Sequence, residues 1–228
     1  MKEKIVILGA GESGLGTAIL AKKQGLNVFV SEQGAINATT KKTFDELDVV
    51  WEEGMHSFSK MLDANWIMKS PGIPSHAPIV SQLKLIKIPV ISEIEFAARY
   101  TSATLIGVTG SNGKTTTSLL THHILVEAGF DVGLAGNIGN SFAREVAEND
   151  HEYYVLEISS FQLDDIHEFT PHIGVITNVT PDHLDRYDQD FNNYLNSKLR
   201  ITKNQNQRDF LIFNSDDPIL KPVVKESL

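Results

Sequence analysis

Hydrophobic and polar positions follow each other along the chain in two series of short apolar runs, each run preceding a segment with helical spacing. The runs are rich in Val, Ile and Leu, which predicts buried strands, and the segments repeat apolar residues every three or four positions, which predicts helices. Alternation of this kind favours parallel sheets covered by helices on both faces. The expected strands are 4–8, 27–31, 49–51, 66–70 and 89–91, then 104–109, 132–134, 153–158, 173–178 and 210–214; the expected helices are 15–24, 78–85, 92–100, 115–128, 142–148 and 190–204.

The domain organisation follows from the two series, because each opens with its own strand, glycine loop and helix. This pattern predicts an α/β protein with a Rossmann-like parallel-sheet domain over residues 1–92 and a P-loop-type α/β domain over 93–228. The helix expected over 92–100 would begin the second domain. The last stretch, "FNSDDPILKPVVKESL", gives no sign that the second sheet is complete, so we expect that domain to be incomplete.

Composition narrows the class of partner and the compartment. The 20 basic and 29 acidic residues give a net charge of −9, which argues against general nucleic-acid binding. An anionic ligand would have to be bound by backbone amides and a few lysines. The chain has no cysteine, which excludes disulfides and thiolate zinc sites and fits a reducing compartment. Without a signal peptide or a membrane-length apolar stretch, we expect a cytoplasmic protein.

The first glycine loop, "ILGAGESGLG", places Gly9, Gly11 and Gly14 directly after the first strand, with Glu32 at the end of the second. This is the dinucleotide-type fingerprint, in which a helix N-terminus is aimed at a phosphate. Three interpretations remain open on the pattern: an NAD or FAD site, a site for another pyrophosphate ligand such as a UDP-sugar, and a simple turn. The loop "KSPGIP" around Gly72 would also let a ligand approach the backbone, although alone it is typical of a turn.

The second glycine loop, "VTGSNGKTT", resembles a phosphate-binding loop but departs from the G-x-x-x-x-G-K-[ST] pattern, since Val108 occupies the first glycine position. A strand precedes it and a helical stretch follows, which favours a nucleotide site over a glycine-rich turn with a solvated lysine. Its backbone amides would bind phosphates, its lysine the β/γ oxygens and its threonine hydroxyl Mg²⁺. The candidate ATP-binding residues are Gly110, Ser111, Asn112, Gly113, Lys114, Thr115 and Thr116.

Three further residues are candidates for the same site. Glu157 ends an expected strand, where a carboxylate can bind Mg²⁺, although it could be an ordinary strand-end glutamate. His183 follows another strand as a candidate metal ligand or phosphate contact, and alone it is more typical of a surface loop. Lys198 leans toward the apolar face of its helix; such lysines usually snorkel, but a partly desolvated one can lose its proton and become reactive.

Taken together, these motifs resemble the Mur ligases, the ATP-dependent amide-forming enzymes of peptidoglycan synthesis. The resemblance covers all 228 residues, and its motifs look specifically like the branch that adds D-glutamate to UDP-N-acetylmuramoyl-L-alanine. The matching segments are "TGSNGKTT" (109–116), "GNIG" (136–139), "LEISSFQL" (156–163), "NVTPDHLDRY" (178–187) and "SKLRI" (197–201).

The resemblance implies that the N-terminal domain binds the uridine diphosphate end of the substrate rather than NAD. Where many relatives carry an Asp-Thr-Arg-like stretch after the second strand, this chain has Ser31-Glu32-Gln33, which leaves the uracil contact there undetermined. By position, the UDP-site residues would be Gly11, Glu12, Ser13 and Gly72, and the contacts to the sugar–peptide part would be Asn137, Ser159 and Gln162.

The resemblance also implies a reaction. ATP would phosphorylate the substrate carboxylate, and the amine of D-glutamate would attack the acyl phosphate. The family pattern implies Lys114, His183 and Lys198 as catalytic residues. One Mg²⁺ would lie on Thr115 and Glu157, and a second near His183 and Lys198, the latter as a carbamate.

The family has a third, C-terminal domain, which we expect to be absent from this chain. We therefore expect these residues to bind the UDP substrate as a monomer, without nucleic-acid or membrane partners and without completing ligation. The alternative, an NAD-dependent oxidoreductase built on the first glycine loop, would leave the second loop, Glu157 and His183 unexplained.

Overall fold

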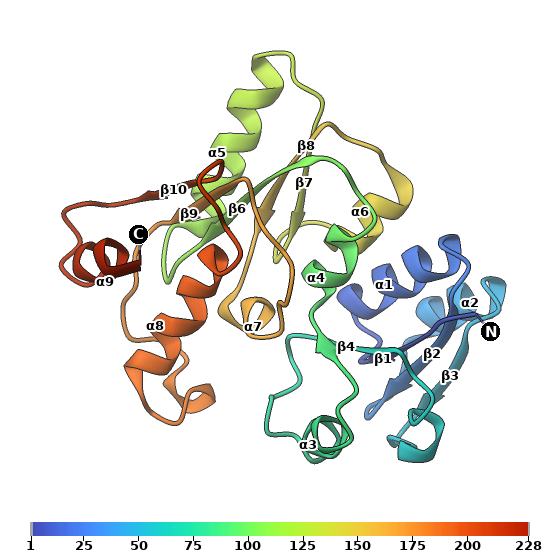
Figure 1. Cartoon of the computed structure of the whole chain (residues 1–228). Helices are drawn as coiled ribbons and strands as arrows, with labels where there is room; N and C mark the ends of the chain where they lie inside the picture. The colour runs from blue at the N-terminus through green and yellow to red at the C-terminus, as the bar shows by residue number, and fades with distance from the viewer. Residues whose placement is uncertain (1, 228) are drawn as a thin grey trace. The chain divides into compact units, whose positions relative to one another are not determined.

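The computed structural model describes residues 2–227, and these residues form two five-stranded sheets, each with parallel strand pairs (Figure 1). The predicted α/β class is confirmed. Two compact units divide the chain: the first runs to Thr101 and includes 140–150 and 165–167, and the second comprises the remainder. Helix α4 (Glu93–Ala98) belongs to the first unit, whereas the sequence placed it at the start of the second domain. Its Ile94 and Phe96 are fully buried, and the helix contacts α1, α6 and β4 of the first unit.

The first sheet has the order β3-β2-β1-β4-β5, so the strand order reverses at β1, which lies between β2 and β4. Open parallel sheets bind ligands at such a reversal, beyond the carboxyl ends of the strands. Helices α1, α4 and α6 contact one another, and strand side chains such as Val6 and Phe29 form a core with Val80 and Leu83 of α3. The elements are β1 (Lys4–Leu8), α1 (Glu12–Lys23), β2 (Asn27–Glu32), α2 (Ala38–Glu46), β3 (Val50–Glu53), η1 (Phe58–Lys60), β4 (Trp66–Lys69), α3 (Pro78–Leu85), β5 (Val90–Ile91), α4 and α6 (Phe142–Glu148).

The second sheet has the order β10-β9-β6-β8-β7, so β6 is its central strand and lies between β8 and β9. Helix α5, which follows β6, contacts β6, β7 and β8. The loop between β6 and α5 therefore lies at the reversal of this sheet. The elements are β6 (Thr104–Thr109), α5 (Lys114–Glu127), β7 (Val132–Gly136), β8 (Tyr153–Glu157), α7 (Ser160–Leu163), β9 (Ile173–Ile176), η2 (Leu184–Arg186), α8 (Phe191–Leu199), η3 (Arg200–Thr202), β10 (Phe210–Phe213) and α9 (Leu220–Ser227).

Two helices of the second unit differ from the simple expectation of an apolar inner face. The apolar residues of α5 are largely exposed, with Leu119, Leu120 and Ile124 between 49% and 56% accessible. The buried face of α8 is centred on Tyr194, Leu195 and Lys198. The apolar residues at its two ends, Phe191 and Leu199, are not among its buried residues. The predicted inward orientation of the lysine is thus correct.

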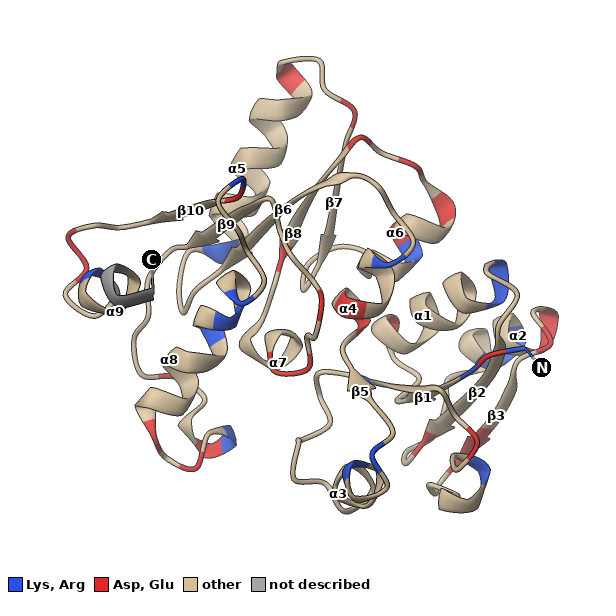
Figure 2. Ribbon diagram, in the orientation of Figure 1, with Lys and Arg blue, Asp and Glu red and all other residues tan. Residues whose placement is uncertain are grey.

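Charged residues of both signs are distributed over both units (Figure 2). Helix α8 illustrates a favourable arrangement: Asp190 caps its N-terminus and Lys198 lies in its last turn. The Asp190 carboxylate opposes the positive partial charge of the helix dipole at the N-terminus. No helix within residues 2–227 is long and apolar enough to cross a membrane.

Glu93 is a charged side chain in the core of the first unit. It is fully buried at the first turn of α4, and its Oε1 accepts a hydrogen bond of 2.6 Å from the backbone N–H of Ala143 in α6. Within the described residues, its Oε2 has no hydrogen-bond partner. Burial raises the pKa of Glu93 to about 7, and the nearby carboxylate of Glu12 acts in the same direction, against the hydrogen bonds from the start of α6.

This pKa predicts how the stability of the first unit depends on pH. Because the folded-state pKa exceeds the unfolded value of 4.5, the contribution of Glu93 to stability is greatest below pH 4.5 and declines as the pH rises toward 7. Glu93→Gln retains an acceptor for Ala143 and removes the ionisation. We expect it to raise the free energy of unfolding by ~2 kcal/mol more at pH 8 than at pH 5, measured by urea unfolding.

The control for this prediction is Glu46→Gln, which neutralises an exposed carboxylate paired with Lys42. It should change stability little at either pH. Equal pH dependence of unfolding in the Glu93→Gln variant and the unaltered chain would contradict the prediction.

Candidate functional site

The second glycine loop connects β6 to α5 and depends on backbone conformations that favour glycine. Gly110 has φ +146° and Gly113, the N-cap of α5, has φ +81°. A Cβ atom at Gly110 would lie 1.9 Å from Oγ1 of Thr177 and 3.1 Å from the carbonyl oxygen of Asn178. Only glycine fits at this position, and Gly113 ends the loop at the N-terminus of α5, where backbone N–H groups lack partners within the helix.

The loop is fastened to the segment that follows β9. Ser111 Oγ donates to the carbonyl of Thr180 and accepts from its N–H, both at 3.0 Å. The backbone N–H of Asn112 donates to Oδ1 of Asn178 at 3.0 Å, and its carbonyl accepts from Nδ2 of the same asparagine at 2.9 Å. Tyr194 of α8 adds a hydroxyl contact of 3.0 Å to Ser111. The sequence analysis did not predict that Asn178, Thr180 and Tyr194 hold this loop. The polar stretch "TNVT" (177–180) directly after a strand was the feature that could have indicated the first two.

Two lysines converge on one carbonyl oxygen of this loop. Lys114 Nζ donates to the carbonyl of Gly110 at 2.9 Å and to that of Ser111 at 3.0 Å. Lys198 Nζ donates to the same Gly110 carbonyl at 2.8 Å and lies 4.6 Å from the ring centre of Tyr194. Burial, reinforced by the charge of Lys114, lowers the pKa of Lys198 to about 7. A substantial fraction of Lys198 is therefore a neutral amine near neutral pH.

Glu157 lies at the carboxyl end of β8 beside the loop. It is buried, and its Oε2 accepts a hydrogen bond of 2.7 Å from the hydroxyl of Thr115, in the first turn of α5. Its Oε1 accepts one of 2.8 Å from the side-chain amide of Asn137. The sequence-predicted pair Thr115 and Glu157 is thus brought together, while Thr116 lies exposed in the same helical turn.

His183 begins η2 in a left-handed conformation, φ +50°, and its side chain is about half exposed. Its Nε2 lies 3.5 Å from Oδ2 of Asp182, and its ring lies 5.3 Å from that of Phe161. The same Phe161 ring stacks on Tyr187. Within residues 2–227, no group of three or more His, Cys, Asp or Glu side chains is arranged to bind a metal.

Ser159 and Gln162, predicted as substrate contacts, form a capping box at the start of α7. Ser159 Oγ accepts from the backbone N–H of Gln162 at 3.3 Å, and Gln162 Oε1 accepts from the N–H of Ser159 at 3.0 Å. Gln162 is buried. Their side chains therefore define the start of a short helix beside Glu157.

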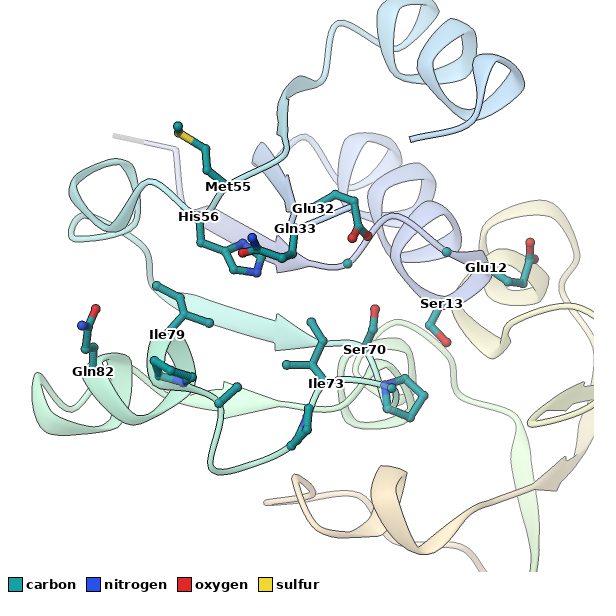
Figure 3. A pocket seen from close by; sticks show the side chains of 17 residues that line it. Glu12, Ser13, Glu32, Gln33, Met55, His56, Ser70, Ile73, Ile79 and Gln82 are labelled. Atoms are coloured by element: carbon teal, nitrogen blue, oxygen red, sulfur yellow. The ribbon is translucent and has the colours of Figure 1, made fainter. Parts of the chain in front are cut away.

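The first unit contains a cavity of about 930 Å³ at the carboxyl ends of β1, β2 and β4 (Figure 3). In Figure 3 the residues Glu32 and His56 line one side, opposite Ser70 and Ile73. All four sequence-predicted UDP-site residues line this one cavity: Gly11, Glu12, Ser13 and Gly72.

The first glycine loop forms the inner end of the cavity. Gly11 is the N-cap of α1, so that the N-terminus of the helix faces the cavity. A Cβ atom at Gly14 would lie 2.0 Å from the carbonyl oxygen of Gly9, which requires glycine for close packing of helix and loop. Glu32 accepts backbone hydrogen bonds of 2.8 Å from Ala10 at Oε2 and from Gly34 at Oε1. Both carboxylate oxygens of Glu32 thus stabilise the backbone around the first glycine loop.

The "KSPGIP" loop is held by a buried lysine. Lys69 Nζ donates to the carbonyl of Ile73 at 3.0 Å and forms an ion pair of 3.0 Å with Asp165, which belongs to the same unit. Both side chains are almost inaccessible to solvent. The lysine therefore connects the carbonyl of Ile73, which follows Gly72 in the loop, to Asp165.

The geometry of Gly110 generates a prediction about the second loop. Gly110→Ala would force a Cβ atom onto Thr177 and hold alanine at a positive φ, at a cost of ~1–3 kcal/mol in strain. We expect the loop to shift and Mg-ATP affinity to fall at least ~10-fold, equal to ~1.4 kcal/mol, by isothermal titration calorimetry.

Gly129→Ala provides the matched control, because Gly129 also has a positive φ of +85° but a Cβ atom there would meet nothing within 4 Å. It should lower stability without changing nucleotide affinity. Equal affinity in the Gly110→Ala variant and the unaltered chain would contradict the argument.

Comparison with protein-family models gives two matches along the chain. The model described as the Mur ligase middle domain matches residues 108–227. The model described as the MurD N-terminal domain matches residues 4–79. The two matched regions contain the second and the first glycine loop respectively.

Two similar curated proteins have the same name. UDP-N-acetylmuramoylalanine--D-glutamate ligase from Christiangramia forsetii is 54% identical over 95% of this chain and 49% of its own length. The protein of that name from Porphyromonas gingivalis is 50% identical over 99% of this chain and 50% of its own length. The chain thus spans about half the length of the curated relatives it matches.

Solved structures support the fold. A UDP-N-acetylmuramate:L-alanyl-gamma-D-glutamyl-meso-diaminopimelate ligase from Neisseria meningitides has a TM-score of 0.66 at 18% identity, covering 99% of this chain and 75% of that one. MurC, the UDP-N-acetylmuramate-alanine ligase from Thermotoga maritima, has a TM-score of 0.59 at 19% identity, covering 96% of this chain and 51% of that one. Since the middle-domain model covers more than half of the chain, and the motifs it spans form the loop just described, this chain belongs to the Mur ligase family.

Proposed function

We propose that the protein to which this chain belongs is an ATP-dependent ligase that joins D-glutamate to UDP-N-acetylmuramoyl-L-alanine in peptidoglycan precursor synthesis. The observation that carries this proposal is the glycine loop with Lys114 and Lys198 on the carbonyl of Gly110. That arrangement supports a site where ATP activates a carboxylate. The choice of D-glutamate rests on the curated relatives named for it.

The ATP site is proposed along the loop and the N-terminus of α5. The backbone amides from Gly113 to Thr116 would bind the phosphates, since those of Ser111 and Asn112 donate to Asn178, and Lys114 would exchange its two loop carbonyls for β/γ-phosphate oxygens. The charge of the lysine and the helix dipole would together offset the charge of two approaching anions.

A magnesium ion fits the oxygens at the end of β8. The Thr115 hydroxyl and the Glu157 carboxylate are only 2.7 Å apart, and Mg²⁺ prefers such oxygen ligands together with phosphates and water. We propose His183 and Lys198, the lysine as a carbamate, for a second ion. When bound, Mg²⁺ would neutralise the charge that develops on the transferred phosphoryl group.

We propose contact residues for two parts of the substrate. Gly11, Glu12, Ser13 and Gly72, in the cavity of the first unit, would bind the uridine diphosphate end. In the second unit we propose Asn137, Ser159 and Gln162 as contacts to the sugar–peptide part. A contact of Asn137 with substrate would compete with its hydrogen bond to Glu157, and one of Ser159 would compete with its hydrogen bond to Gln162.

The proposed chemistry has two steps. An oxygen of the lactyl-L-alanine carboxylate attacks the γ-phosphorus of ATP, and ADP leaves, giving an acyl phosphate. The amine of D-glutamate then attacks the carbonyl carbon, and the tetrahedral intermediate collapses with loss of inorganic phosphate and a proton. Lys114 would stabilise the charge in the first step, and His183 would contact the acyl phosphate. We further propose that the protein acts in the cytoplasm as a monomer.

Binding of the UDP substrate tests the proposal. At 100 times its Kd, UDP-N-acetylmuramoyl-L-alanine should stabilise the first unit by ~2.7 kcal/mol and raise Tm by at least ~5 °C in a thermal-shift assay. NAD at the same concentration should not change Tm. Stabilisation by NAD and not by the UDP compound would instead favour an oxidoreductase. Because the chain spans about half the length of its relatives, we expect no turnover with D-glutamate.

The lowered pKa of Lys198 generates a second prediction. The neutral amine adds to the carbon of CO₂ and releases one proton, which gives a carbamate. With ¹³C-labelled bicarbonate and Mg-ATP at pH 8, the chain should show a ¹³C carbamate resonance that is absent in Lys198→Arg. The exposed Lys42→Arg variant should retain the resonance. A spectrum of the unaltered chain without that resonance would refute the carbamate.

A further inference from the structure

A chain of hydrogen bonds in the first unit ends at a histidine in the cavity wall. Ser31 Oγ, at the end of β2, lies 2.8 Å from Oε1 of Glu52 and 2.7 Å from Nδ1 of His56. A third neighbour, the carbonyl of Met55, is more distant at 3.4 Å. Ser31 is fully buried, whereas His56 is half-buried and lines the cavity. The hydrogen bonds of Ser31 therefore determine which ring nitrogen of His56 carries a proton.

The ionisation state of Glu52 determines which atoms donate in these hydrogen bonds. Burial acts to raise its pKa, but hydrogen bonds from Ser57, Lys60 and Ser31 outweigh it and lower the pKa of Glu52 to about 2. The carboxylate is thus ionised and can only accept. The single hydroxyl hydrogen of Ser31 must point to Glu52, since otherwise two lone pairs would face each other at 2.8 Å.

The tautomer of His56 follows from this assignment. With its hydrogen on Glu52, Ser31 can only accept from the imidazole, so Nδ1 of His56 carries a proton. Burial lowers the pKa of His56, against the opposing influence of Glu32 and Glu52, and the ring is neutral near pH 7. Its Nε2 is then an acceptor, and none of the described residues donates a hydrogen bond to it.

We propose that His56 is the residue that recognises the base of the bound nucleotide, with Nε2 accepting a hydrogen bond from the imide N3–H of a uracil. This inference rests on the proposed binding of a UDP compound in the cavity. Uracil carries a donor at N3, whereas cytosine presents an acceptor there, so an acceptor in the wall selects uracil.

Glu32 is poorly suited to the same role. Both of its oxygens already accept backbone N–H groups, from Ala10 and from Gly34, and moving it would release the first glycine loop. His56 lines the cavity on the same side in Figure 3 and donates to Ser31 with its other ring nitrogen. A specificity contact can therefore form at His56 without breaking any hydrogen bond of the fold.

The test compares UDP, CDP and N3-methyl-UDP by isothermal titration calorimetry. The unaltered chain should bind UDP at least ~10-fold more tightly than the other two, as expected when a buried donor or acceptor is left unpaired. In His56→Phe the three affinities should become equal within ~2-fold, mainly through a loss of ~10-fold for UDP. The control His123→Phe, at an exposed histidine of α5, should leave all three affinities unchanged.

A second measurement examines the tautomer directly. Two-bond ¹H–¹⁵N correlation spectra of the unliganded chain should show His56 with Nδ1 protonated and Nε2 unprotonated. Ser31→Ala removes the acceptor of Nδ1, and we expect a mixture of tautomers with a reduced UDP preference although the imidazole is still present.

The outcomes separate the inference from the proposed function. If the unaltered chain binds UDP and His56→Phe keeps the preference over CDP, His56 is not the residue that recognises the base, while the UDP site remains. A protonated Nε2 in the unliganded chain would also overturn the inference. If the unaltered chain binds no UDP, both the proposed function and the inference are wrong.

Discussion

The carbonyl oxygen of Gly110 accepts hydrogen bonds from Lys114 and Lys198, and the chemistry proposed for the second unit depends on this convergence. The two ammonium groups cannot both be fully charged so close together without cost, and the more buried Lys198 has the lowered pKa. A loop that presents this carbonyl must turn sharply, which the positive φ of Gly110 allows. The glycine therefore shapes the loop whose carbonyl accepts from a lysine 88 residues away, and burial together with the charge of Lys114 lowers the pKa of that lysine.

Local sequence pattern predicted the parts of this site that depend on local geometry. Gly113 and Lys114 follow from a strand–loop–helix motif, and the burial of Lys198 follows from its spacing on α8. The roles of Asn178 and Tyr194 did not follow, since their hydrogen bonds to the loop join residues 66 and 83 positions apart. These hydrogen bonds depend on which strands are neighbours in the sheet. The pattern of a single sequence carries little information about strand order.

The fold was predicted on the same terms. Strands such as β1 and β6 have the expected bounds, because a buried parallel strand is an uninterrupted apolar run. Helix α2 was not expected, since only Thr40 and Phe44 of it are buried and its start is defined by the cap of Asn37. In the first unit, the glycine fingerprint left the ligand open. The hydrogens on His56 depend on an ionised glutamate and could not have been inferred from sequence.

Helix α5 presents its N-terminus to the glycine loop and carries Leu119, Leu120, Ile124 and Val126 along its length, each at least 45% exposed. Apolar surface of this kind favours association over hydration, and salts excluded from protein surfaces strengthen that tendency. The net charge of −9 opposes it through repulsion between molecules. Solubility therefore depends on the balance between association through the apolar side chains of α5 and repulsion by the net charge. It should fall as added salt screens that repulsion.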